Sequence, residues 1–230
     1  MSFVLTAYFF VLFQVGIVVL AALSFVFKPF GPRGERGFYA CLAAFLRFLI
    51  PLSFIRVEIR GRENIPRHGR LILAGNHPGL LEPMYLIAYL PLKLVLVADD
   101  GLTGLPFLGR VIKTAGCLTY RRRTTDVAFL IGLRDALADG QNLLVFPKQL
   151  RRLGAADKIE YDDDLVRTAA AAGATIVPFV VEQPGGALLS RGLFVTPGKT
   201  TIRIGKPLPP RAADGAAELQ RRFEQLMEGG

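Results

Sequence analysis

The stretch LILAGNHPGLLEP, residues 71–83, decides the fold. Its apolar start predicts a short buried strand that ends near Gly75, followed by a polar turn at Asn76 and His77. A helix is predicted to begin near Leu80. Strands that alternate with helices in this way form parallel sheets, and such sheets bind ligands in the loops at the carboxyl ends of their strands. The stretch therefore places an imidazole where a site is expected.

The same alternation continues from residue 55 to the end of the chain. We predict an α/β fold with a mostly parallel sheet flanked by helices. We also predict two parts, N-terminal membrane-anchoring helices over residues 1–54 and an α/β domain over residues 55–230. The predicted strands are 55–60, 70–74, 92–98, 117–120, 142–146, 175–181, 192–195 and 201–204, and the predicted helices are 80–90, 105–114, 125–139, 163–172 and 216–227.

Composition narrows the class of protein. Hydrophobic residues make up 51% of the 230 residues, charged residues make up 20%, and the formal net charge is +9. This excludes a disordered chain and favours anionic partners. Two cysteines and two histidines cannot build a disulfide framework or a His/Cys zinc site by themselves. The sequence also lacks the G-x-G-x-x-G, P-loop, H-E-x-x-H and G-x-S-x-G signatures.

Residues 1–27 carry no charge and are long enough to cross the hydrocarbon core of a membrane as a helix. A cleaved signal peptide would need a basic start and a shorter apolar run, so we expect a retained anchor. The basic residues that follow, starting with Lys28, predict that the rest of the chain lies in the cytoplasm. Residues 38–54 are predicted to form an interfacial helix with Arg47 snorkelling to the membrane surface. The alternative is a hairpin of both segments that enters one leaflet.

His77 and Glu82 are the candidate catalytic pair. A carboxylate held against one imidazole nitrogen makes the other nitrogen a better base, and the corner between loop and helix lets residues five apart meet. The bland alternative is a structural histidine. Two basic clusters, Arg121–Arg123 and Lys148 with Arg151, follow predicted strands. They are either an anion site or a solvated face, and their position at strand ends favours the anion site.

These motifs resemble those of the 1-acylglycerol-3-phosphate acyltransferases and related lysophospholipid acyltransferases. The segment from Asn76 to Pro83 is similar to the first block of that family, His, four residues, Asp. Residues 99–123 are similar to the second block, Phe146-Pro147 followed by Arg151 to the third, and residues 176–179 to the fourth. The four blocks occur in the family's order over roughly residues 55–205.

The resemblance implies a membrane-bound O-acyltransferase. His77 would be the general base, oriented by Glu82, and would activate a lipid hydroxyl to attack the thioester of acyl-CoA or acyl-carrier protein. Asn76, Arg121, Arg122, Lys148 and Arg151 would bind substrate. It implies no metal and no cofactor beyond the thioester co-substrate. The expected partners are membrane lipids and not nucleic acid, and the expected place is a bacterial inner membrane, with the oligomeric state left open.

This sequence departs from the family pattern in ways that bear on function. Glu82 stands where the family has Asp, and keeps a carboxylate. In the third block Lys148 and Gln149 replace Glu and Gly, which makes the presumed acceptor pocket more positive. We hypothesise that the acceptor differs from ordinary lysophosphatidate. The alternative is a non-catalytic lipid-binding relative on the same fold. A nucleic-acid-binding protein is disfavoured, because no recognition helix or aromatic-basic strand occurs and residues 1–27 would be unexplained.

Overall fold

The computed structural model describes residues 2–76, 81–120, 127–146, 163–182, 195, 197–210 and 215–228. The chain divides into two compact units. Unit 1 comprises residues 1–57, 78–121 and 183–200, and unit 2 comprises residues 58–77, 122–182 and 201–230. The expected boundary at residues 54 and 55 stays a prediction.

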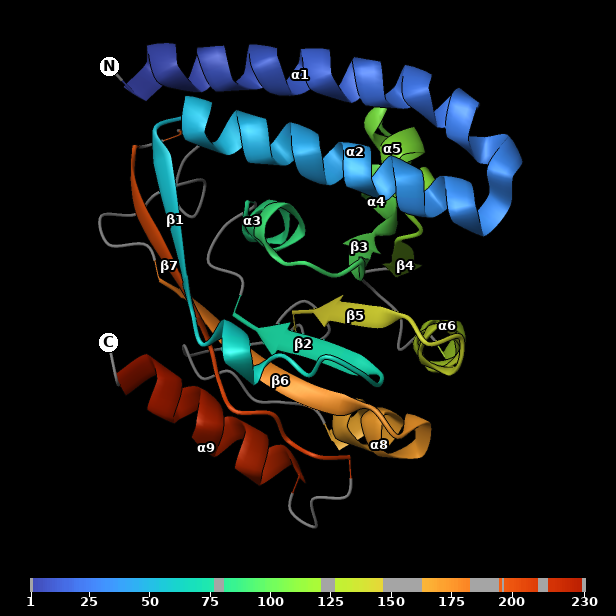
Figure 1. Ribbon diagram of the computed structural model, residues 1–230, viewed down its shortest axis with the longest axis vertical. Helices are drawn as coiled ribbons and strands as arrows, with labels where there is room; N and C mark the ends of the chain where they lie inside the picture. The colour runs from blue at the N-terminus through green and yellow to red at the C-terminus, as the bar shows by residue number, and fades with distance from the viewer. Residues whose placement is uncertain are drawn as a thin grey trace. The chain divides into compact units, whose positions relative to one another are not determined.

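Unit 1 begins with two long helices that pack side by side (Figure 1). Helix α1 spans Ser2–Phe27, a short 3-10 turn η1 spans Lys28–Phe30, and α2 spans Gly31–Leu52. The helices approach closely at Gly16, where a Cβ would lie 2.0 Å from the Phe45 ring and would force that ring to move. Among the described residues, the stretch Phe3–Leu52 is the one helical region long and apolar enough to cross a membrane.

The rest of unit 1 packs on this pair. Helix α3 (Glu82–Tyr89) packs against α2, and α5 (Leu108–Thr114) packs against α1. Strand β3 (Leu94–Asp99) pairs in parallel with β4 (Leu118–Tyr120), and a short helix α4 (Asp100–Thr103) follows β3. Arg47 was expected to reach toward the membrane surface. Arg47 is exposed, and its Nε donates to the Ala88 carbonyl oxygen at 2.9 Å, because the last turn of α3 leaves carbonyl groups without intrahelical partners. Its reach toward a membrane surface stays a prediction.

Unit 2 is built around strand β2 (Leu71–Gly75), whose five residues are all buried. It pairs in parallel with β5 (Asn142–Val145) on one side and with β6 (Thr175–Glu182) on the other. Strand β6 also pairs antiparallel with residues 201–204 of β7 (Gly198–Ile204). Strand β1 spans Ile55–Arg60, of which residues 58–60 belong to unit 2, and the 3-10 turn η2 spans Arg62–Asn64.

Three helices cover these strands. Helix α6 (Val127–Ala138) packs against β5, while α8 (Asp163–Ala172) and α9 (Gly215–Glu228) pack against β6 (Figure 1). Arg70, just before β2, donates from Nη1 to the Ala172 carbonyl oxygen at 2.7 Å and from Nη2 to that of Ala138 at 3.3 Å. One guanidinium therefore ties the carboxyl ends of two helices to the start of the central strand, where a cation also suits the helix dipoles.

The predicted fold class is confirmed as a mixed α/β arrangement flanked by helices, with a long apolar helix near its start. Most predicted elements occur within a few residues of their expected bounds. The antiparallel β6–β7 pair is the departure from a parallel pattern. Of the strand predicted at 192–195, residues 192–194 lie outside the described residues and Val195 is not in a strand.

Candidate active site

The carboxyl ends of β2, β5 and β6 define one edge of unit 2. Gly75 lies opposite Phe179 in the parallel register, and Ala74 lies opposite Val145. A Cβ on Gly75 would lie 2.4 Å from the Phe179 carbonyl oxygen, so the two backbones approach as closely as glycine alone allows. The Phe146 and Phe179 rings pack edge to face, with 5.9 Å between their centroids. This close packing fixes the point from which the chain leaves β2.

Asn76 continues this edge with its side chain. Its Nδ2 donates to the Val181 carbonyl oxygen at 3.0 Å, and its Oδ1 accepts from the Val181 N–H at 2.7 Å. The amide thus satisfies both backbone groups of a buried β6 residue. Asn76 was predicted to bind substrate, and that contact stays a prediction. The observed bonds give it a positioning role, because they anchor the residue that directly precedes His77.

Glu82 begins helix α3 in unit 1 and is 0% exposed. A carboxylate in the first turn of a helix is stabilised by the helix dipole, but full burial of a charge also requires a partner. Tyr85, one turn further along α3, is equally buried, and so is Thr200. Burial and then the charge of Glu82 raise the pKa of Tyr85 well above its usual range. The Tyr85 phenol therefore stays neutral beside this carboxylate.

Sequence reasoning missed Tyr85 and Thr200. The spacing of three residues from Glu82 puts Tyr85 on the same helical face, which is a signal the sequence does carry. No comparable signal exists for Thr200, which follows Glu82 by more than a hundred residues. The Glu82 charge and the Thr200 side chain both act on the pKa of the Tyr85 phenol, so Tyr85 and Thr200 belong to the surroundings of the candidate catalytic carboxylate.

Five of the predicted site residues lie outside the described residues: His77, Arg121, Arg122, Lys148 and Arg151. Four of them, all but Arg151, follow a described residue within two positions. Asn76 and Phe146 end their segments at the same sheet edge of unit 2, and His77 and Lys148 follow them within one and two residues. In unit 1, Arg121 directly follows the last residue of β4. The catalytic and binding roles of these side chains stay predictions.

Cys117 is not an activated nucleophile. Burial raises the pKa of its thiol to about 11, although the nearby Lys93 ammonium acts in the opposite direction. The thiol is therefore protonated at neutral pH, and thiols react as thiolates.

Comparison with known proteins identifies the class that this fold and site define. The family model described as Acyltransferase matches residues 56–182, more than half of the chain. The chain therefore belongs to the acyltransferase family. The match includes β2, Asn76, Glu82, β5 and β6, which are the elements that form the edge and the buried carboxylate described above.

Two relatives and one solved structure place the chain further. It is 22% identical over 158 residues to the 1-acyl-sn-glycerol-3-phosphate acyltransferase of Borreliella burgdorferi, covering 68% of this chain and 63% of that protein. It is 30% identical over 153 residues to an uncharacterized protein of Mycobacterium leprae, covering 60% of this chain and 39% of that protein. The chain thus spans less than two thirds of the length of these relatives.

The fold is similar to the crystal structure of the 1-acyl-sn-glycerophosphate (LPA) acyltransferase PlsC from Thermotoga maritima. The TM-score is 0.77 at 21% sequence identity, and the match covers 100% of this chain and 94% of that one. At this identity the likeness concerns the fold. It includes the α1–α2 region, because the whole chain is covered.

Proposed function

We propose that this protein is a membrane-bound O-acyltransferase that moves a fatty acyl group from acyl-CoA or acyl-carrier protein to the hydroxyl of a lysophospholipid or related lipid. The observation that carries this proposal is the full burial of Glu82 at the start of α3, inside the region that matches the family. A buried carboxylate five residues after a histidine is suited to orient that imidazole.

The proposed reaction needs one base and no covalent acyl-enzyme. The free imidazole nitrogen of His77 takes the proton of the acceptor hydroxyl while that oxygen attacks the thioester carbonyl carbon. The tetrahedral intermediate then collapses, the carbon–sulfur bond breaks, and the leaving thiolate takes the proton back from the imidazolium. The products are an ester and a free thiol. Glu82 keeps the imidazole in the productive tautomer and stabilises its positive charge.

The other predicted residues complete the proposal. Asn76 positions the chain before His77, on the strength of its two bonds to Val181. Arg121, Arg122, Lys148 and Arg151 hold the phosphate groups of the substrates, because guanidinium and ammonium groups favour phosphate oxygens. We propose that no metal or further cofactor takes part. The long apolar α1 attaches the protein to the membrane that supplies the acceptor.

The test compares His77→Ala and Glu82→Gln with Glu63→Gln in a transfer assay that uses labelled acyl-CoA or acyl-carrier protein and a panel of lysolipids. Glu63 is exposed in η2, so its substitution makes the same chemical change away from the buried carboxylate. Removal of a general base costs about 10²–10⁴-fold in rate. We expect losses in that range for His77→Ala and Glu82→Gln, and none for Glu63→Gln.

Two outcomes contradict the proposal. Equal transfer by His77→Ala would remove the imidazole from the mechanism. A wild-type protein that binds lysolipid but transfers no acyl group to any acceptor would favour the non-catalytic lipid-binding relative, to which the altered third block at Lys148 also points.

A further inference from the structure

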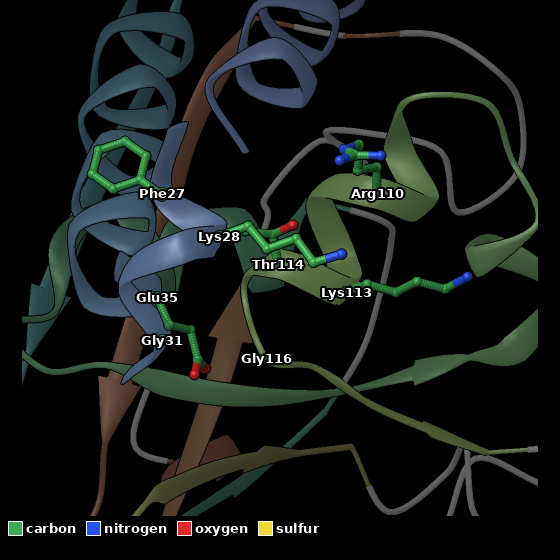
Figure 2. Close-up of a pocket in the computed structure, with 8 residues that line it drawn as sticks. All are labelled: Phe27, Lys28, Gly31, Glu35, Arg110, Lys113, Thr114 and Gly116. Carbon is green, nitrogen blue, oxygen red and sulfur yellow. The ribbon is translucent and has the colours of Figure 1, made fainter. Parts of the chain in front are cut away.

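A basic pocket of about 490 Å³ lies in unit 1, where α1 ends and α2 begins (Figure 2). Three cationic side chains line it: Lys28, the first residue of η1, and Arg110 and Lys113 on α5. None of these three residues has a role in the proposed acyl transfer. The pocket therefore requires its own explanation.

The charge of the lining is unbalanced. Glu35 is the one carboxylate among the lining residues, and it is ion-paired with Lys93. In the part of the chain that the structure describes, Lys28 and Lys113 have no ion-pair partner. Figure 2 shows the Lys28 and Lys113 side chains extending to the same side, with the Glu35 carboxylate turned away from them. The pocket consequently favours an anion.

Contacts with α1 restrain the Arg110 guanidinium in a position that can bind such an anion. Its Nε donates to the Ser24 hydroxyl at 2.6 Å, and its guanidinium lies 3.3 Å from the centroid of the Phe25 ring. Ser24 is itself fixed, since it is 1% exposed and donates to the Ala21 carbonyl oxygen. These contacts occupy Nε, and the two Nη groups donate to none of the described residues. A guanidinium restrained in this way presents a fork that fits two phosphate oxygens.

The position of the pocket indicates which kind of anion binds there. Helix α1 carries no charged residue, and Lys28 is the first charge after it. Phe25, Val26 and Phe30, beside the pocket, are each at least 60% exposed. Exposed apolar side chains next to cations are typical of a surface at the level of lipid headgroups. A phosphate that is carried on apolar chains would satisfy both parts of this surface.

We propose that this pocket binds the headgroup phosphate of an anionic phospholipid from the membrane that α1 enters. The proposal rests on the proposed membrane attachment but not on acyl transfer. The lipid would be a resident of the bilayer and not the acceptor. Its phosphate would bridge Arg110 and the two lysines, which lie far apart in the sequence, and would so hold the α1 end against α5.

The test measures binding of short-chain phosphatidylglycerol to the full chain in neutral-detergent micelles, by native mass spectrometry and titration calorimetry. Neutral micelles remove the general attraction of an anionic surface. We expect one bound lipid per chain. Lys113→Gln and Arg110→Gln should each weaken binding by about 10-fold or more, because a charge-assisted hydrogen bond is lost. Arg33→Gln removes an exposed charge from α2 outside the pocket and should leave binding unchanged.

Three other results overturn the inference. An equal loss in Arg33→Gln would mean general electrostatics, and inorganic phosphate that binds as tightly would mean a site for free anions. A raised KM for the lysolipid in the two pocket variants, without any change in phosphatidylglycerol binding, would assign the pocket to the acceptor. If Arg110→Gln disrupts the packing of α1 against α5, Lys113→Gln still tests the proposal, because Lys113 makes no described hydrogen bond to α1. A wild-type protein with bound lipid but no acyl transfer would refute the proposed function alone.

Discussion

Asn76→Ala removes two hydrogen bonds at once from the edge that leads to His77. The lost bonds are the Nδ2 donation to the Val181 carbonyl oxygen at 3.0 Å and the Val181 N–H donation to Oδ1 at 2.7 Å. A typical intramolecular hydrogen bond contributes about 0.5–1.5 kcal/mol net, and Val181 is only 3% exposed, so water cannot readily replace the amide. We expect the free energy of unfolding to fall by about 2 kcal/mol.

Thermal unfolding of the purified protein measures this loss. About 2–4 °C of Tm corresponds to 1 kcal/mol in a chain of this size, so Tm should fall by about 4–8 °C. Asn64→Ala is the matched control, because Asn64 makes a single described side-chain bond, from Nδ2 to the Ile204 carbonyl oxygen at 2.8 Å. Its Tm should fall by about half as much. Acyl transfer measured below both Tm values should decrease in Asn76→Ala and not in Asn64→Ala.

An Asn76→Ala protein as stable as the parent would refute the reasoning, since it would show that the two bonds to Val181 are not formed in solution. A protein that is destabilised but transfers acyl groups at the parental rate would separate the two parts of the argument. Such a result would confirm that the Asn76 side chain anchors the chain to β6, and it would show that this anchor does not affect catalysis by His77.

Three further predictions follow from the described contacts and the third block. Arg70→Ala should lower the free energy of unfolding by about 1–3 kcal/mol in a denaturant titration, because two helix-end carbonyl groups lose their donor; unchanged stability would contradict the tie. Cys117, whose pKa is raised to about 11, should resist alkylation at pH 8 and react faster as the pH approaches 11; rapid alkylation at pH 7 would contradict the raised pKa. Lys148→Glu combined with Gln149→Gly should change the acceptor preference across the lysolipid panel, and an unchanged preference would count against our hypothesis for the third block.

The local pattern of the sequence predicted most of the fold. Helix α8 occurs at its predicted bounds, and β2 and β5 lie within one residue of theirs, because alternating apolar runs and turn residues report burial directly. Such patterns do not determine the relative direction of paired strands, so they could not predict that β7 pairs antiparallel with β6. The hydrogen bond from Arg47 to Ala88 could not be predicted from the sequence either, since the two residues become neighbours only through the packing of α2 on α3.

The candidate site divides in the same way. The His77–Glu82 spacing is local and carries its own signal, and the burial of Glu82 agrees with it. The basic pocket carries no such signal. Lys28 was interpreted only as a charge that flanks the membrane segment, and Arg110 and Lys113 were assigned to no site, because some eighty residues separate them from Lys28. Contacts between distant segments depend on the tertiary fold, which motif spacing does not encode.

The proposed mechanism is tested most directly by acyl transfer from a labelled thioester to a lysolipid, measured with the purified full chain and compared between the wild-type protein and Glu82→Gln. We predict transfer by the wild-type protein and a loss of about 10²–10⁴-fold in the variant, with lysolipid binding retained. Transfer by Glu82→Gln at the wild-type rate would contradict the claim that the buried carboxylate of α3 orients the catalytic base.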